Sequence, residues 1–314
     1  MKAVLLYAYG DPGQLRYEDT DMPKYGDNEV LVKIRATSIN PIDLKMRSGA
    51  AKSRMPLEFP AILGRDLCGE VVETGRTVTG FPKGMRVIAL ANRTYAEYTV
   101  AKADVLSPIP DALNFEQAAA LPLVTTTGSQ LIERAVKPKA GQTVLVTGAL
   151  GAVGRTAVHV ARKHGARVLA GVRAKEKEEA AKLNVDGIVA IDSEEEIGHL
   201  HDLDAIADTV GGSTIQRLLK TIRKGGVIGS VLGQPEGADK YDIQVEAFMA
   251  QPDASRLYQL AEDVARHEFS IPIARTMKLQ EIQEAHRIFE QGGLSGKIVL
   301  ALRVHTHDRD KRDC

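Results

Sequence analysis

The stretch TVLVTGALGAVG, residues 143–154, decides the fold of this chain. An apolar run at residues 144–146 leads into a glycine-rich turn, and the apolar stretch 155–164 follows at helical length. A strand that passes through such a turn into a helix opens a βαβ unit, and repeated units of this kind build a sheet of parallel strands. The sequence therefore predicts an α/β domain with a doubly wound parallel sheet.

The turn itself has the spacing of a dinucleotide fingerprint. Ala149, Gly151 and Gly154 fall at the positions of GxGxxG, with alanine at the first site. Gly151 would let the backbone approach a diphosphate, and the free amides at the start of the helix favour its negative charge. Glycine-rich turns also serve packing alone, so this alternative stays open. The expected contacts are Ala149, Leu150, Gly151, Ala152, Val153 and Gly154.

The next strand, residues 166–173, ends in a basic residue. Sites that prefer NAD usually place an acidic residue there, where it binds the ribose 2′-hydroxyl. Here the strand ends in Arg173, and Lys175 and Lys177 follow. A guanidinium can bind a 2′-phosphate through two hydrogen bonds, so we expect NADPH, held by Arg173 and Lys177. The alternative is a basic, solvated start to a helix over residues 175–183.

Composition limits the class of protein. The 314 residues carry 41 basic and 41 acidic side chains, so no net field favours nucleic acid or anionic lipid. No apolar run approaches the roughly 18 residues that a membrane span needs, and the first residues are not expected to act as a signal peptide. Two cysteines, Cys68 and Cys314, cannot build a disulfide framework. We expect a soluble, cytoplasmic protein with neither a nucleic-acid nor a membrane partner.

The chain leaves a β-rich region, builds the α/β region and returns. Short strands are predicted at residues 1–8, 29–38, 66–74, 86–91 and 95–100. Parallel strands are then predicted at 143–147, 167–170, 187–191, 205–208 and 226–230, with residues 220–226 forming a helix end capped by glycine. Alternation returns at 269–279, before a helix at 280–291 and a strand at 297–302.

These patterns predict two domains and a tail. Residues 1–115 and 267–303 form the β-rich domain, and residues 116–266 form the dinucleotide-binding domain. Residues 304–314 are charged and aperiodic, and we expect them to be disordered. The histidines His305 and His307 belong to that tail and are not expected to bind metal.

Six segments, the glycine turn among them, carry a resemblance to a known superfamily by their order and spacing. They are KIRATSINPIDLKMRSG at 33–49, PAILGRDLCGEVVETG at 60–75, AALPLVTTTGSQLI at 119–132, the glycine turn, DTVGG at 208–212 and GKIVL at 296–300. The chain resembles the medium-chain dehydrogenase/reductase superfamily over residues 1–302, and within it the zinc-independent branch of quinone oxidoreductases (zeta-crystallin-like) and enone reductases. The resemblance implies a Rossmann domain and a GroES-like β-rich catalytic domain.

The zinc-dependent members of the superfamily differ from this chain at their metal ligands. They place cysteine where this chain has Asn40, and Gly-His-Glu where it has Gly64, Arg65 and Asp66. An amide and a guanidinium are not zinc ligands, and the four-cysteine structural zinc loop is also missing. The resemblance therefore implies a protein without metal.

The resemblance also implies the catalytic residues. In the family the asparagine that matches Asn40 lies near the nicotinamide and the substrate; the alternative is that Asn40 shapes the turn before Pro41. Lys45 would hydrogen-bond the developing enolate, or else is a surface cation. Asp43 is expected to be structural, bracing Arg47 or the turn.

The remaining expected contacts surround the cofactor. Thr127 matches a family threonine near the nicotinamide, although the repeat at residues 125–127 leaves its register open and a helix N-cap is the alternative. Val231, Leu232 and Gly233 follow the fifth strand and should lie against the nicotinamide. Lys297 resembles a residue that borders the same cleft.

The resemblance implies an oxidoreductase that reduces small-molecule quinones or α,β-unsaturated carbonyls with NADPH, by direct hydride transfer without metal. Two alternatives stay open, a non-catalytic NADPH-binding protein and an enoyl reductase of a carrier-bound acyl chain. A homodimer is expected by analogy, through a sixth strand at the sheet edge, although residues 237–245 offer little regular strand pattern.

Overall fold

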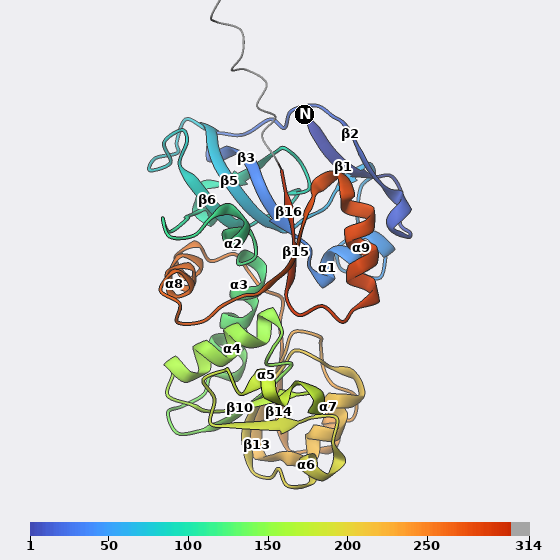
Figure 1. The fold of residues 1–314 in the computed structure, drawn as a ribbon, viewed down its shortest axis with the longest axis vertical. Helices are drawn as coiled ribbons and strands as arrows, with labels where there is room; N and C mark the ends of the chain where they lie inside the picture. The colour runs from blue at the N-terminus through green and yellow to red at the C-terminus, as the bar shows by residue number, and fades with distance from the viewer. Residues whose placement is uncertain (303–314) are drawn as a thin grey trace, which may run out of the picture. The chain divides into compact units, whose positions relative to one another are not determined.

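The computed structural model describes residues 1–302, so the predictions for residues 304–314, including His305 and His307, lie outside the described residues. The chain divides into two compact units (Figure 1). The first comprises Met1–Pro122 and the segment that begins at Ile273, and the second comprises Leu123–Pro272. In this architecture an α/β unit with a parallel sheet is separate from a β-rich unit, as the sequence predicted.

The second unit is built on a six-stranded parallel sheet. Its order is β11-β10-β9-β12-β13-β14, so the chain starts in the middle, runs to one edge and then to the other. The strands are β9 (Thr143–Thr147), β10 (Arg167–Val172), β11 (Gly187–Ala190), β12 (Leu203–Asp208), β13 (Ile222–Ser230) and β14 (Ile243–Ala247).

Helices cover both faces of this sheet because its strands are apolar on both faces (Figure 1). In β9, Val144 and Val146 belong to the core that α4 packs against, whereas Leu145 belongs to the core on the other face, with residues of α6 and α7. The helices are α3 (Pro122–Gln130), a π-helical turn (Leu131–Val136), α4 (Ala152–Lys163), α5 (Lys177–Ala180), α6 (Glu194–Gly198), α7 (Gly212–Leu218) and α8 (Ala254–Ala265).

The first unit contains a three-stranded and a seven-stranded sheet. The smaller has the order β2-β1-β4, and the larger has β15-β16-β3-β5-β6-β8 with β7 also paired to β3. The strands are β1 (Lys2–Leu6), β2 (Leu15–Asp19), β3 (Glu29–Ser38), β4 (Ala61–Ile62), β5 (Asp66–Thr74), β6 (Arg86–Leu90), β7 (Tyr98–Lys102), β8 (Ser107–Pro108), β15 (Ile273–Lys278) and β16 (Lys297–Ala301). The helices are α1 (Pro41–Ser48), α2 (Phe115–Ala119) and α9 (Ile282–Gln291).

The strands β3, β5 and β9 have the bounds that the sequence predicted. The helix end predicted at residues 220–226 is wrong, because a short 3₁₀ turn ends at Thr221 and β13 begins at Ile222. Ile222 already pairs with Leu203 of β12, and a register shift then accommodates the glycines that resembled a helix cap.

Residues 237–245 were expected to give little regular strand; this holds for 237–242, which include a 3₁₀ turn at Ala238–Lys240, but a strand that was not predicted begins at Ile243. β14 pairs in parallel with β13 along five residues and forms the edge of the sheet. Ile243 and Val245 alternate towards the core, which is enough to fix the strand although the segment is polar overall.

The helix predicted at 175–183 is shorter than expected, with a 3₁₀ turn at Ala174–Glu176 followed by α5.

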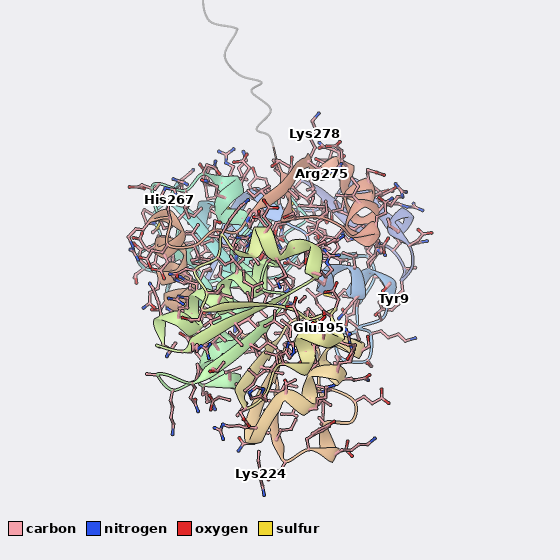
Figure 2. All side chains as sticks on the ribbon, turned by 60° about the horizontal axis from the view of Figure 1, so that its bottom comes forward. Tyr9, Glu195, Lys224, His267, Arg275 and Lys278 are labelled. Atoms are coloured by element: carbon pink, nitrogen blue, oxygen red, sulfur yellow. The ribbon has the colours of Figure 1, made fainter. Side chains whose placement is uncertain are left out.

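Charged side chains cover the outside of both units, and Lys224 and Lys278 extend outward from the ribbon (Figure 2). Among the described residues, none of the helices has both the length and the apolar character that crossing a membrane requires.

Candidate functional site

A buried polar group surrounds Asn40 in the first unit. Asn40 lies between β3 and α1 and is fully buried. Its Nδ2 donates to the Asp66 carboxylate at 2.7 Å. Lys297 Nζ donates to Asn40 Oδ1 at 2.5 Å and to the Ile39 carbonyl at 2.9 Å, and it lies 3.5 Å from Asp66 Oδ2. Both ends of the Asn40 amide are therefore held by charged neighbours.

Sheet topology explains why these distant residues meet. Ser38 ends β3, Asp66 begins β5 and Lys297 begins β16. Both β5 and β16 run antiparallel to β3, so their first residues lie beside its last residues. The Ser38 hydroxyl also donates to the Asp66 carboxylate. The sequence singled out Asn40 as catalytic and Lys297 as a cofactor contact, but it did not predict that the two meet or that Asp66 joins them.

Lys297 places its ammonium group in the protein interior, where a charge is unfavourable. Burial lowers the pKa of Lys297, and the carboxylates of Asp66 and Asp43 oppose that shift. A buried ammonium needs such a partner, because an uncompensated charge in the interior costs several kcal/mol. Lys297 was predicted to contact the cofactor; its ammonium is turned towards Asn40, and the cofactor contact stays a prediction.

Of the two roles expected for Asp43, the structure supports bracing of the turn, whereas Arg47 has other partners. Its Oδ2 accepts from the Asn40 backbone N–H at 2.9 Å, as in a capping box. Burial raises the pKa of Asp43 to about 7, and the hydrogen bond from Asn40 opposes this shift. Arg47 contacts the Glu290 carboxylate and the Gly10 carbonyl. The Asn-Pro turn and its capping thus form one structural unit with Asn40.

Lys45 lies on α1 with its side chain exposed. Within residues 1–302, no hydrogen bond or ion pair holds its ammonium group. Its role as the donor to an enolate stays a prediction.

The glycine turn in the second unit has the geometry of a dinucleotide cradle. The Gly151 N–H donates to the Gly148 carbonyl at 2.9 Å. A Cβ on Gly154 would lie only 2.1 Å from that same carbonyl oxygen, so glycine is required for this close packing. α4 begins at Ala152, and the amides of its first turn have no partner within the helix. The turn therefore fits the diphosphate of a dinucleotide.

Thr127 lies inside α3, which begins at Pro122, so the alternative of a helix N-cap is wrong. Its hydroxyl donates to the Leu123 carbonyl one turn earlier, at 2.6 Å. The next residue, Gly128, lies so close to α4 that a Cβ would be 2.6 Å from the Val153 carbonyl. Gly128, which was not among the predicted residues, therefore lets α3 approach the first turn of α4 closely.

Asp208, at the end of β12, organises the loops around the glycine turn. It accepts from the Thr147 hydroxyl at 2.9 Å and the Ser230 hydroxyl at 3.1 Å, and these residues end β9 and β13. The Ser230 hydroxyl in turn accepts from the Leu232 N–H, so the predicted contacts Val231, Leu232 and Gly233 follow a fixed strand end. An acidic residue at the end of an apolar strand is the sequence signal that would have pointed to Asp208 as part of the site.

The two cations predicted to bind a 2′-phosphate are paired with carboxylates. Arg173 follows β10 directly and is exposed, and its guanidinium contacts Glu176. The hydrogen bond to Glu176 raises the pKa of Arg173. Lys177 Nζ lies 2.8 Å from the carboxylate of Glu196. Any phosphate bound by Arg173 would compete with Glu176.

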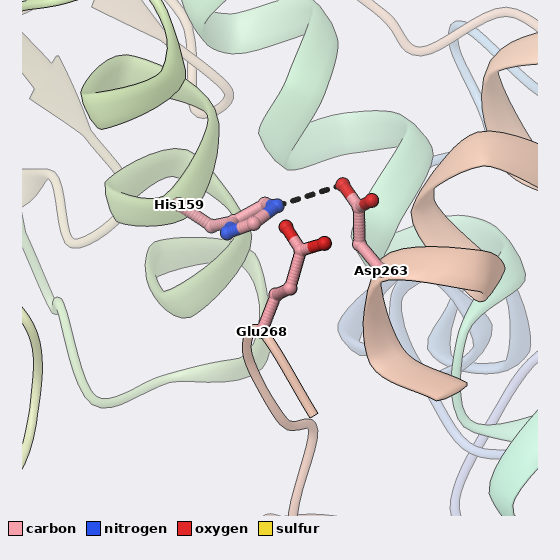
Figure 3. A group of neighbouring side chains, drawn as sticks. All are labelled: His159, Asp263 and Glu268. Carbon is pink, nitrogen blue, oxygen red and sulfur yellow. Dashed lines mark hydrogen bonds and ion pairs between the residues drawn. The ribbon is translucent and has the colours of Figure 1, made fainter. Parts of the chain in front are cut away.

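A cluster on α4 and α8 has side chains of the metal-ligating types. His159 Nε2 lies 2.8 Å from Asp263, and Glu268 follows α8 (Figure 3). The Lys163 ammonium lies 2.8 Å from both carboxylates. Arg266 also contacts Asp263. Lys163 and Arg266 neutralise the carboxylates, so the cluster is a set of ion pairs that links α4 to α8.

Comparison with known proteins relates both units to dehydrogenases. Residues 26–111 match the family model described as alcohol dehydrogenase GroES-like domain, and residues 183–300 match the one described as zinc-binding dehydrogenase. The quinone oxidoreductase of Mus musculus is 30% identical, over 96% of this chain and 98% of its own length.

Two solved structures have the same fold. The quinone oxidoreductase of Coxiella burnetii matches with a TM-score of 0.87 and 29% identity, over 96% of this chain and 99% of that one. A mycobacterial protein solved in complex with NADPH matches with a TM-score of 0.83 and 25% identity, over 96% and 100% of the two chains. The chain belongs to the quinone oxidoreductase branch of the medium-chain dehydrogenase/reductase superfamily and is an oxidoreductase with a GroES-like domain.

Proposed function

We propose that this protein reduces quinones or α,β-unsaturated carbonyls with NADPH, by direct hydride transfer and without metal. The observation that carries the proposal is the group around Asn40, where the Lys297 ammonium lies 2.5 Å from the amide oxygen. Zinc-dependent relatives have a metal ligand at this position, whereas here the amide binds a cation of the protein itself. An amide held by an ammonium ion is not a zinc ligand.

The cofactor would be held by the second unit. Its diphosphate would lie on the turn at residues 149–154, and its 2′-phosphate would displace Glu176 from Arg173. When bound, NADPH supplies the hydride. The mycobacterial relative solved with NADPH supports this choice of dinucleotide.

Negative charge that develops on the acceptor oxygen would be stabilised by donors of the first unit. A hydrogen-bond donor or cation close to that oxygen stabilises the developing charge. Asn40 is held rigidly on both sides, and Lys45 is exposed with its ammonium free of carboxylates in the described part of the chain. We assign Asn40 a positioning role and Lys45 the role of a donor to the oxygen.

The test is the oxidation of NADPH by the purified protein with a panel of quinones, enals and enones, followed at the nicotinamide absorbance. We expect turnover with at least one class, undiminished after dialysis against a chelator. Loss of the rate on chelation, restored by added zinc, would contradict the metal-free mechanism. Tight NADPH binding by calorimetry without turnover of any acceptor would instead favour a non-catalytic binding protein.

We also propose that the protein is a cytoplasmic homodimer. β14 supports the dimer because it is an edge strand of the parallel sheet, open to pairing with a second copy. Sedimentation equilibrium would measure the mass. A monomer at micromolar concentration would contradict this proposal and leave the proposed reaction unaffected.

A further inference from the structure

A small concavity in the first unit has an arginine in its lining. It has a volume of about 460 Å³, within the range of small-molecule sites. Most of its lining residues are apolar and come from residues 56–65, between α1 and β5, and the rest come from α1 and from the segment after β6. The lining includes Met46, Leu57, Phe59, Ile62, Arg65 and Asn92.

The arginine, Arg65, has donors to spare. Its Nη1 donates to the Asn92 side chain at 2.6 Å, and its Nε is buried without a partner. Among residues 1–302 no carboxylate forms an ion pair with it, whereas the buried Arg47 pairs with Glu290. Burial lowers the pKa of Arg65, and the neighbouring carboxylates Asp43 and Asp66 oppose the shift. An arginine without an ion-pair partner in a concavity is a binding-site candidate.

Two contacts of Tyr9 hold the apolar part of the lining in place. The Leu57 N–H donates to the hydroxyl of Tyr9 at 2.9 Å, and the Tyr9 ring meets Phe59 edge to face with centroids 4.9 Å apart (Tyr9 is labelled in Figure 2). Phe59 is nevertheless exposed. An apolar surface held in place beside a guanidinium fits a ligand with a flat apolar body and an anionic end.

We propose that Arg65 binds a carboxylate of the substrate, so that the preferred acceptor is a conjugated carbonyl compound carrying a carboxylate on an apolar frame. A guanidinium presents two parallel donors that match the two oxygens of a carboxylate, whereas a neutral carbonyl would occupy only one of them. This inference rests on the proposed function for the reaction itself, and it adds the substrate class.

Two other charged residues line the concavity. Arg93 and Glu58 are both exposed, so solvent screens their charge more than that of Arg65. Asn92 fixes the direction of the Arg65 guanidinium, whose other donors have no hydrogen-bond partner within residues 1–302. Arg65 is therefore the residue whose desolvated charge a carboxylate would neutralise.

Binding of unreactive probes tests the inference without turnover. Calorimetry should show that 2-naphthoate binds the purified full-length protein more tightly than the neutral 2-naphthamide. Arg65→Gln should weaken 2-naphthoate binding about 10- to 100-fold, as expected for loss of a hydrogen-bonded ion pair, and leave the amide unchanged. Equal binding of acid and amide, or no effect of Arg65→Gln, would overturn the inference.

Matched variants and substrates complete the test. Arg93→Gln removes the same charge from the same concavity and should change 2-naphthoate binding less than about twofold; a larger loss there than in Arg65→Gln would overturn the assignment. If Arg65→Gln fails to fold, Arg65→Lys keeps the charge but not the paired donors, and unimpaired binding would overturn the inference.

Turnover separates this inference from the proposed function. Arg65→Gln should raise the KM for 3-benzoylacrylate but not for its methyl ester. A wild type that binds 2-naphthoate through Arg65 but oxidises NADPH with neither of these acceptors nor menadione would contradict the proposed function alone. Turnover of menadione with no dependence on Arg65 for 3-benzoylacrylate would contradict the inference alone.

Discussion

Two cation–carboxylate pairs in this protein have the same chemistry but differ in their exposure and in the elements that surround them. In the first unit, Lys297 and Asp66 lie 3.5 Å apart with side chains 6% and 0% exposed. In the second unit, Arg173 contacts Glu176 and its side chain is 54% exposed. The first pair is enclosed by β3, β5 and β16, whereas the second follows the end of one strand.

The difference separates structural charge from charge available to a ligand. A buried pair cannot change partners, because removing either charge strands the other in a medium of low polarity. An exposed pair contributes little to stability and can exchange its carboxylate for a phosphate. We therefore expect variants of Lys297 to affect folding first, and variants of Arg173 to affect cofactor binding alone.

The largest effect is expected from Lys297→Met. It leaves Asp66 buried without its cation, which should lower the free energy of unfolding by about 3–5 kcal/mol. Urea denaturation followed by circular dichroism would measure it. In the double variant Lys297→Met, Asp66→Asn no charge is stranded, so part of the loss should be recovered. A cost below about 1 kcal/mol for the single variant would show that the pair is not the enclosed element described above.

Two other buried groups of the first unit should make stability depend on pH in opposite directions. Burial raises the pKa of Asp43 from 3.8 to about 7, so its contribution is present below about pH 4 and is lost as pH rises to 7. Burial, and secondly the charge of Arg47, lowers the pKa of His286 from 6.5 to about 3. Its contribution is present above pH 6.5 and is lost as pH falls towards 3. Between these limits the two contributions change the free energy of unfolding in opposite directions as pH rises, so their pH dependences cancel.

Single substitutions would expose each slope. Over about pH 4 to 6.5, the unfolding free energy of Asp43→Asn should rise with pH, and that of His286→Gln should fall, each by about 3 kcal/mol at 1.36 kcal/mol per unit. Urea denaturation at several pH values measures the slope, which is independent of any constant loss of stability. Parallel slopes in the two variants would contradict the opposed titrations.

The exposed pair should respond in cofactor binding instead. Arg173→Asp should raise the KM for NADPH about 10- to 100-fold, because a charge-assisted contact to the 2′-phosphate is lost, which is far more than any rise in the KM for NADH. Its unfolding free energy should stay within about 0.5 kcal/mol of wild type. Steady-state kinetics with both cofactors measures the effect.

Glu176 provides the matched control. Glu176→Gln frees Arg173 from its ion pair and should lower the KM for NADPH, the opposite direction. Equal changes for NADPH and NADH in Arg173→Asp would refute the role given to Arg173.

The sequence predicted much of the fold because its signals are local. The glycine turn identified β9 and α4, and the alternation of β3 gave its bounds. β14 was missed because two inward apolar residues, Ile243 and Val245, suffice once β13 provides the neighbouring strand. That information lies in the tertiary structure and not in the segment.

The polar group around Asn40 shows the same limit. Asn40 was singled out from a resemblance, but the residues that hold it, Asp66 and Lys297, are 26 and 257 positions away. Their meeting depends on the order of β16, β3 and β5, which no local pattern encodes. Likewise, the sequence indicated only that Arg65 is a poor zinc ligand, because its buried Nε without a hydrogen-bond partner among the described residues is visible only in the structure.

The cluster on α4 and α8 lies between the two extremes and should give the smallest effect. Lys163 is 44% exposed, and Asp263, at 6%, also has His159 and Arg266 as partners. The pKa of Asp263 is lowered although burial opposes this, because Lys163 and His159 donate hydrogen bonds to it.

Lys163→Met should therefore cost only about 0.5–1 kcal/mol of unfolding free energy, since two cationic or hydrogen-bonding partners remain. Lys182→Met, which removes a surface cation from Glu179, is the control and should cost less than about 0.5 kcal/mol. Both are measured by urea denaturation at neutral pH. If Lys163→Met cost as much as Lys297→Met, the exposure of a pair would not decide its contribution, because the carboxylate of Asp263 is almost as buried as that of Asp66 and only the cations differ.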